Sequence, residues 1–138
     1  MSTTALMKRP RSVREVAERA NAGQQPFRFA LAEMLDEVYK MSPPVQRFAL
    51  AYEPPLLDPS NEDYGDWQDA YLAAVAEHLS RAAKLPIPAW VDNPGRFLKR
   101  PYFANGGIES LKAMLLAESP LSFRRRMIFV EAQPLRRA

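Results

Sequence analysis

Five acidic residues lie close together in the middle of the chain. They fall within twelve positions that hold no basic residue, and they are Asp58, Glu62, Asp63, Asp66 and Asp69. A calcium loop would need its ligands in another order, with a glutamate at the twelfth position. Acid–base catalysis would need paired carboxylates in an enclosed pocket, which so polar a segment does not favour. Two interpretations stay open: carboxylates that cap helices and face solvent, or an acidic surface for a basic protein partner.

Basic residues of the C-terminal third form a second candidate site. The triplet is Arg124, Arg125 and Arg126, and further basic residues would extend it, namely Arg96, Lys99 and Arg100. Three consecutive side chains cannot share one helix face, so we expect at least one to point to solvent. Arginine suits planar, bidentate recognition of carboxylate or phosphate. Ion pairs with the acidic middle of the chain, a protein partner and nucleic-acid phosphates are the three alternatives.

Few residues can support catalysis or metal binding. The chain has no cysteine and one histidine, His78, which excludes disulfides, thiolate zinc sites and cysteine nucleophiles. His78 falls within a helical pattern and has no histidine at ligand spacing, so we expect a partly exposed helix residue. Only five glycines are present, and none forms a phosphate-binding loop. We therefore expect no catalytic residue, no metal site, no cofactor and no enzymatic activity.

Aromatic residues suggest a further interpretation. A stacking surface for nucleic-acid bases could be built from six of them, which are Trp67, Tyr71, Trp90, Phe97, Tyr102 and Phe103. Five of the six stand next to a proline or on an apolar stripe. That placement favours packing in the core.

Length and composition are those of one globular domain. The chain has 138 residues, 47% hydrophobic and 25% charged, which argues against wholesale disorder. Thirteen prolines predict stiff connectors between short elements. No apolar run is long enough to span a membrane, and no apolar segment follows the basic N-terminus as in a signal peptide. We expect a cytoplasmic protein.

Charge is distributed unevenly along the chain. Residues 26–95 hold five basic and eleven acidic residues, whereas residues 96–138 hold nine basic and three acidic ones. The two regions could neutralise each other within the fold or face different partners. At the N-terminus, residues 1–11 read as a flexible basic arm, in which Lys8, Arg9 and Arg11 could contact nucleic acid.

The elements that must position these residues are helical. Apolar residues recur every three or four positions, and the pattern predicts helices over 12–23, 26–41, 43–53, 66–84, 108–118 and 120–126, with a single turn at 95–99. Ser12 and Glu15 form a capping box, and Gly23 suits the position after the helix end. Residues 85–90 should be extended, and 127–130 should be a strand or an extended tail. We predict an all-α fold over residues 12–138, a single domain of six to seven short helices with proline-rich connectors.

The apolar positions of two predicted helices define expected buried faces. In the helix over 43–53 the inward residues are Val45, Phe48, Ala49 and Tyr52. In the helix over 108–118 they are Ile108, Leu111, Met114 and Leu115.

Several sequence blocks resemble a family of small bacterial proteins of uncharacterised function. They are FALAEMLDEVY (29–39), AYEPPLL (51–57), AYLAAVAEHLSRAAKLPIPAWV (70–91), PGRFLKRPYFA (94–104) and ESLKAMLLAESPLSFRRRMIFV (109–130). The last block is the most specific, and it is similar to the end of longer antitoxin-like proteins that begin with a helix-turn-helix domain. The resemblance implies a bacterial partner protein of a toxin, often a nucleotidyltransferase-like one. It supplies no catalytic motif.

Two functions follow as expectations. The first is a non-enzymatic protein-binding module, an antitoxin-like partner of a toxin encoded by a neighbouring gene. Its interface would use the five acidic residues between Asp58 and Asp69. It would also use Arg96, Arg100 and the triplet Arg124–Arg126. The second is a regulatory protein that binds nucleic acid through the basic arm and Arg124–Arg126. A homodimer is compatible with both.

Overall fold

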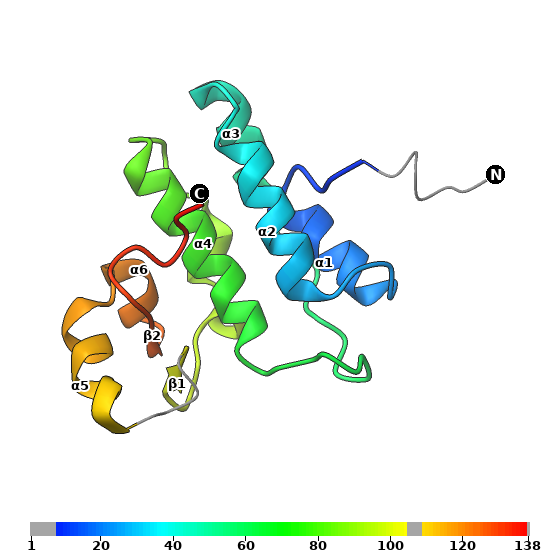
Figure 1. Ribbon diagram of the computed structural model, residues 1–138. Helices are drawn as coiled ribbons and strands as arrows, with labels where there is room; N and C mark the ends of the chain where they lie inside the picture. The colour runs from blue at the N-terminus through cyan, green and yellow to red at the C-terminus, as the bar shows by residue number, and fades with distance from the viewer. Residues whose placement is uncertain (1–7, 105–108, 138) are drawn as a thin grey trace.

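The computed structural model describes residues 8–104 and 109–137 and has the predicted all-α fold (Figure 1). Helices make up 52% of it. The α-helices are α1 (Val13–Asn21), α2 (Phe27–Val38), α3 (Pro43–Ala51), α4 (Gln68–Ala82), α5 (Glu109–Glu118) and α6 (Leu121–Arg124). Two short 3-10 helices, η2 (Ala89–Asp92) and η3 (Pro94–Arg96), follow α4. The strands β1 (Tyr102–Phe103) and β2 (Ile128–Phe129) pair in parallel.

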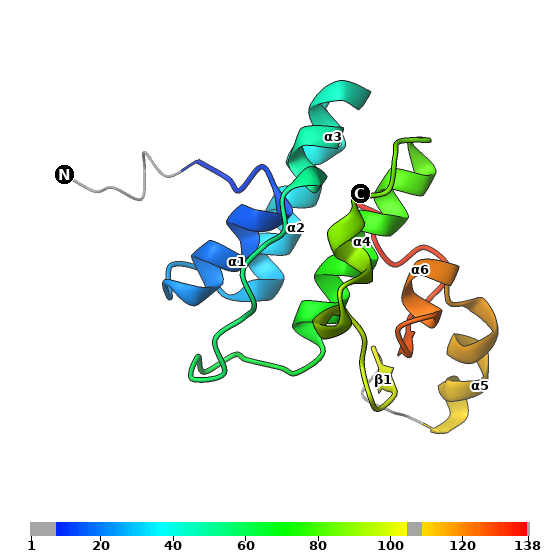
Figure 2. The ribbon, with the colours of Figure 1, turned by 180° about the vertical axis from the view of Figure 1, so that it is seen from behind.

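Helix α4 occupies the middle of the molecule. Figure 1 shows α1, α2 and α3 on one side of it and α5 and α6 on the other, and the view from behind in Figure 2 shows the same arrangement. The segment that follows β2 returns toward α2, where the Tyr39 hydroxyl donates a hydrogen bond to the carbonyl oxygen of Leu135 at 2.7 Å. The candidate residues of both halves of the chain are therefore positioned around one central helix.

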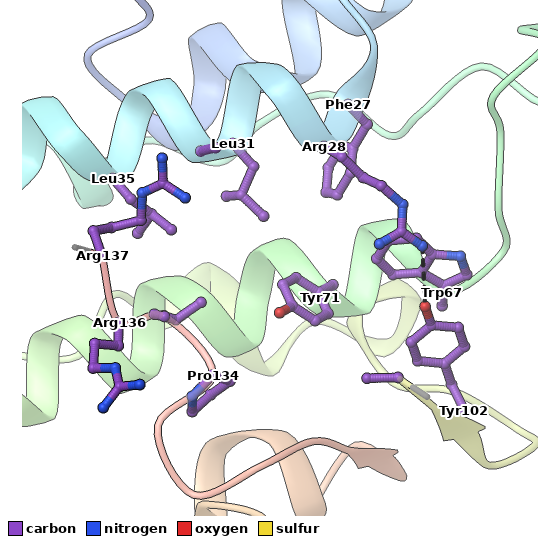
Figure 3. A pocket seen from close by; sticks show the side chains of 13 residues that line it. Phe27, Arg28, Leu31, Leu35, Trp67, Tyr71, Tyr102, Pro134, Arg136 and Arg137 are labelled. Carbon is purple, nitrogen blue, oxygen red and sulfur yellow. Dashed lines mark hydrogen bonds between the residues drawn. The ribbon is translucent and has the colours of Figure 1, made fainter. Parts of the chain in front are cut away.

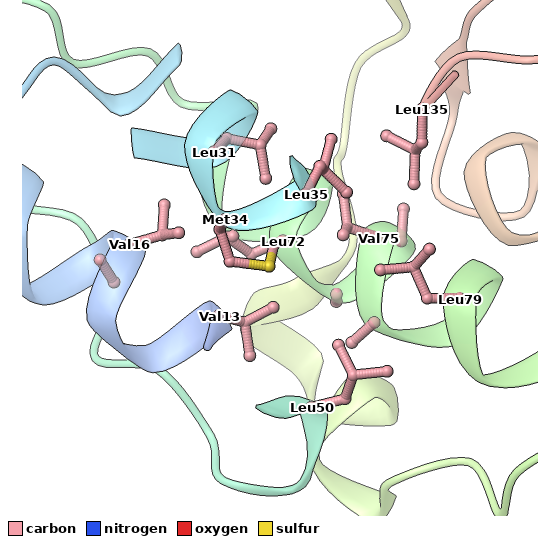
Figure 4. Close-up of a cluster of buried hydrophobic side chains, with 14 of the residues drawn as sticks. Val13, Val16, Leu31, Met34, Leu35, Leu50, Leu72, Val75, Leu79 and Leu135 are labelled. Atoms are coloured by element: carbon pink, nitrogen blue, oxygen red, sulfur yellow. The ribbon is translucent and has the colours of Figure 1, made fainter. Parts of the chain in front are cut away.

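The core is one cluster of buried side chains that runs from Val13 in α1 to Leu135 near the chain end. Figure 4 shows α1, α2 and α4 contributing to it. Residues with no measurable exposure include Val16, Met34 and Leu72. Alanines fill much of the inward face of α4, which allows neighbouring elements to approach that helix closely.

Local signals at the two ends of α1 are confirmed, with one difference. The Ser12 hydroxyl accepts from the backbone N–H of Glu15 at 3.1 Å, as a capping serine should. Glu15 reaches back to the N–H of Arg11 rather than that of Ser12. Gly23 has a φ of 70°, and the N–H of Gln24 bonds the carbonyl oxygen of Arg19. This is the helix end for which glycine is selected.

The expected buried face of α3 is confirmed at Ala49 and wrong at its other three positions. Val45, Phe48 and Tyr52 are 43%, 68% and 57% exposed, and the residues that α3 buries are Ala49 and Leu50. The amphipathic pattern exists, but α3 lies at the edge of the molecule and turns another side toward the core. A correct helix prediction therefore came with a buried face that was wrong at three of its four residues.

The C-terminal half departs further from the predicted elements. Trp90 lies in η2 rather than in an extended segment. The turn expected at 95–99 forms at Pro94–Arg96, and β1 forms where no helix or strand was expected. Residues 127–130 were expected to form a strand or an extended tail. Strand β2 forms within this segment. On α5, Leu115 is buried but Leu111 and Met114 are 38% and 43% exposed; Ile108 lies outside the described residues.

The described part of the N-terminal arm is held against α2. Pro10 is buried, and the Arg9 guanidinium lies 3.5 Å from the Asp36 carboxylate and 3.6 Å from that of Glu37. Residues 8–11 therefore do not project freely, and the remainder of the expected arm lies outside the described residues. Within those residues, no helix combines the length and the apolar character that crossing a membrane requires.

Candidate functional site

Three of the five acidic residues hold the loop that precedes α4. Asp63 accepts from the backbone N–H of Phe27 at 2.8 Å, which caps α2 from 36 positions away. Asp69 accepts from the N–H of Leu57 at 2.8 Å. Asp58 accepts from the backbone and the hydroxyl of Ser60. Helix capping therefore applies to Asp63 alone, whereas Asp58 and Asp69 satisfy backbone donors of the loop itself.

The environments of these carboxylates differ. Burial raises the pKa of Asp69, although the N–H of Leu57 and the charge of Arg96 act in the opposite direction. Hydrogen bonds from Ser60 lower the pKa of Asp58. Glu62 and Asp66 are exposed and make no hydrogen bond or ion pair to the described residues. These two carboxylates are the ones left available to a partner.

Arg96 is a structural residue of the interior. Its side chain is 1% exposed, and it donates to the Glu53 carboxylate and to the carbonyl oxygens of Asp69 and Pro54. Its guanidinium also lies 5.0 Å from the ring centre of Trp90. These contacts remove Arg96 from the expected partner-binding surface.

The Arg126 side chain is also buried and hydrogen-bonded inside the protein. It has no exposed side-chain surface and donates to the Glu77 carboxylate at 2.8 Å. Its remaining donors reach the carbonyl oxygens of Arg96, Ser122 and Val91. A guanidinium with no exposed surface cannot contact a partner, so Arg126 likewise leaves the expected interface.

The Glu77 carboxylate, on the central helix α4, pairs with three arginines. Arg81 and Arg125 join Arg126 at its carboxylate, at 3.0 and 2.9 Å, and Arg125 also pairs with Asp92 at 2.8 Å. Burial alone would raise the pKa of Glu77, but hydrogen bonds from Arg126 and Arg81 outweigh it and hold the pKa below its ordinary value. The alternative of ion pairing with the acidic middle therefore applies to Arg125 and Arg126.

Three basic members of the predicted site stay on the surface, namely Lys99, Arg100 and Arg124. None of them makes an ion pair within the described residues. The structure thus divides the predicted arginines into buried or paired ones, which hold the fold, and two that a partner could reach. The predicted residues do not converge on one site.

His78 is the only histidine, and its protonation should weaken the fold. Burial lowers its pKa below the ordinary 6.5, although Glu77 opposes this, and its ring packs 5.7 Å from that of Phe123. The unfolded chain therefore takes up a proton at higher pH than the folded one. Stability should fall as pH drops from 7 through about 6.5 toward 5. We expect His78→Gln to flatten this part of a plot of urea midpoint against pH; an unchanged slope would contradict the assignment.

A cavity of about 290 Å³ lies between α2, α4, β1 and the C-terminal segment. Figure 3 shows Arg28 at one side of it, Arg136 and Arg137 at the other, and the Tyr71 hydroxyl pointing into it. The Trp67 and Tyr102 rings stack at 4.7 Å, and the Arg28 guanidinium lies 4.9 Å from the Trp67 ring. The described lining comprises Phe27, Arg28, Leu31, Ala32, Leu35, Trp67, Tyr71, Tyr102, Ala104, Pro134, Leu135, Arg136 and Arg137.

The sequence prediction missed this cavity. Trp67, Tyr71 and Tyr102 were expected to pack in the core, and they do lie partly buried against it. Arg28 and the arginines at 136 and 137 belong to segments far apart in the chain. The adjacency of Phe27 and Arg28 was the only local signal, and it is too common to identify a site.

No metal site is built in the described part of the chain, because no group of three histidine, aspartate or glutamate side chains gathers there. The chain also matches no protein-family model, no curated protein and no solved structure. Its function is therefore inferred from the geometry of its surfaces.

Proposed function

We propose that this chain is a non-enzymatic protein-binding module of the bacterial cytoplasm, an antitoxin-like partner that neutralises a toxin encoded by a neighbouring gene. The supporting observation is the exposed apolar face of α3. Val45 and Phe48 on that helix and Tyr52, the residue that follows it, are 43%, 68% and 57% exposed. Exposed aromatic side chains grouped on one element are typical of protein interfaces.

The placement of the arginines favours a protein partner over nucleic acid. Arg126 and Arg96 are buried, and Arg125 pairs with Glu77 and Asp92. Of the predicted patch, Lys99, Arg100 and Arg124 are exposed and make no ion pair within the described residues. Phosphate binding is driven by clustered accessible cations, whereas the face on α3 offers apolar area.

The acidic residues and the family resemblance suggest the kind of partner. A toxin that acts on nucleic acid needs a basic cleft to hold the phosphates. Glu62 and Asp66 could occupy part of such a cleft, because both are exposed. The resemblance of residues 109–130 to antitoxin-like proteins adds a nucleotidyltransferase-like toxin as the candidate class.

A matched pair of substitutions tests the proposal. Phe48 on α3 and Phe29 on α2 are 68% and 66% exposed, so Phe48→Glu and Phe29→Glu make the same chemical change on two different surfaces. The tagged chain is expressed with its neighbouring genes and purified. We expect the Phe48→Glu variant to recover at least about tenfold less of the neighbour-encoded protein, while Phe29→Glu recovers the normal amount. Cells that express the toxin should grow poorly with the Phe48→Glu variant and normally with Phe29→Glu.

Three outcomes contradict the proposal. One is the absence of any neighbour-encoded protein from the purified material. Another is equal recovery with both variants. The third is recovery with nucleic acid that dissociates steeply as salt is added, which would support the nucleic-acid alternative and make Arg124 the first residue to replace.

A further inference from the structure

We propose that the cavity between α2, α4, β1 and the C-terminal segment binds a small organic anion, a carboxylate or a phosphate monoester carried on an apolar ring system. This inference does not depend on the proposed function. It concerns a cavity lined by different residues from those on the exposed face of α3.

The charged side chains that line the cavity are all positive in the described part of the chain. Its charged lining residues are Arg28, Arg136 and Arg137, and no acidic residue lines it in the described part of the chain. Arg137 is already paired with Asp36 at 2.8 Å. This leaves two guanidinium groups beside the cavity without a carboxylate partner among the described residues.

The contacts of Arg28 and Arg136 leave the charge of each guanidinium group available to a ligand. Arg28 donates to the Tyr102 hydroxyl at 3.4 Å and lies over the Trp67 ring. Arg136 reaches the Gln133 side chain at 3.5 Å. Stacking on Trp67 orients the Arg28 guanidinium without using its charge in an ion pair. An oriented guanidinium beside an apolar cavity is suited to a planar carboxylate or to a phosphate.

The remaining lining determines the body of the ligand. Leu31, Leu35 and Pro134 supply apolar walls, and the Tyr71 hydroxyl points inward (Figure 3) without a hydrogen bond to the described residues. Burial raises the pKa of Tyr71 to about 12, so its hydroxyl stays protonated and can donate to an anion. Among the described residues, no carboxylate or side-chain amide lines the cavity to accept from a nucleobase, which favours an apolar ring.

The size agrees with this class. The volume of about 290 Å³ lies at the small end of known ligand pockets, so it suits a compact ring system bearing one charged group. Such a ligand would place its ring against Leu31 and Leu35 and its anion in the positive potential of Arg28 and Arg136, which lie on opposite sides of the cavity.

The test uses three probes with one ring and different charges. The full chain is titrated by calorimetry with naphthoate, naphthyl phosphate and neutral naphthamide. We expect at least one anion to bind with a Kd below about 1 mM, and naphthamide to bind at least about fivefold more weakly. Tighter binding of one anion than of the other then shows whether the natural ligand is a carboxylate or a phosphate monoester. If neither anion binds, or if naphthamide binds as tightly as both, the proposal is wrong.

Variants connect the binding to this cavity. Arg28→Gln and Arg136→Gln should each weaken the preferred anion by up to about fivefold, the effect expected of a solvent-accessible charge pair. Arg124→Gln removes an exposed arginine that does not line the cavity and should leave the affinity unchanged. Equal weakening by all three variants would indicate general charge attraction and overturn the site. Circular dichroism of each variant establishes that it is folded.

Discussion

Replacing Glu77 by glutamine is expected to lower the free energy of unfolding by about 3 kcal/mol. Glu77 is 1% exposed and accepts from Arg81, Arg125 and Arg126. Glutamine keeps the shape and one acceptor oxygen but removes the charge. Arg126 would then stay buried with its carbonyl partners and no counter-ion, and an uncompensated buried charge is strongly destabilising.

The matched control is Glu18→Gln. Glu18 forms one ion pair with Arg14 on α1, and both side chains are at least half exposed. Because such a pair contributes little, we expect its removal to change the free energy by less than about 0.5 kcal/mol. Urea unfolding followed by circular dichroism measures both values. Similar small losses from the two variants would show that the arginines around Glu77 are accommodated without its charge.

Replacing Phe123 by alanine should cost about 3–5 kcal/mol. Phe123 has no exposed surface and packs edge-on against Tyr71 and near His78. It joins α6 to the central helix, so the cavity left by its ring would lie where the two halves of the molecule meet. A loss of this size is a large part of the stability of a small domain.

The comparison for this variant is Phe48→Ala. The chemical change is identical, but Phe48 is 68% exposed on α3, so we expect a change within about 0.5 kcal/mol. Thermal and urea unfolding give the two values. A substantial loss from Phe48→Ala would mean that the α3 face is needed for folding, and it would weaken the case for an interface there.

Signals that act over a few residues could be read from the sequence. Ser12 caps α1 and Gly23 ends it, because both effects depend on backbone geometry within one helical turn. The all-α class followed from the spacing of apolar residues. Long-range partners could not be read in this way. Asp63 caps α2, which precedes it by 36 positions, rather than the helix that follows it.

The same limit explains the errors at the candidate site. Nothing in the pattern of α3 indicates that Val45 and Phe48 are exposed, because periodicity shows which residues share a face and not what covers it. At least one side chain of the triplet Arg124–Arg126 was expected to point to solvent, and Arg124 does, whereas Arg126 is buried. That Glu77 would be the shared partner depended on α6 packing against α4, which no local signal specifies.

The segment that returns to α2 has a consequence for the kinetics of folding. Arg137 pairs with Asp36 across 101 positions, Tyr39 bonds Leu135 across 96, and Arg28 reaches Tyr102 across 74. Helical proteins fold in microseconds to milliseconds when their contacts are mostly local, and more slowly as the sequence separation of contacts rises. Closing such long loops must precede the contacts that stabilise them. This helical protein should therefore fold more slowly than its helix content suggests, at rates closer to those of mixed α/β domains.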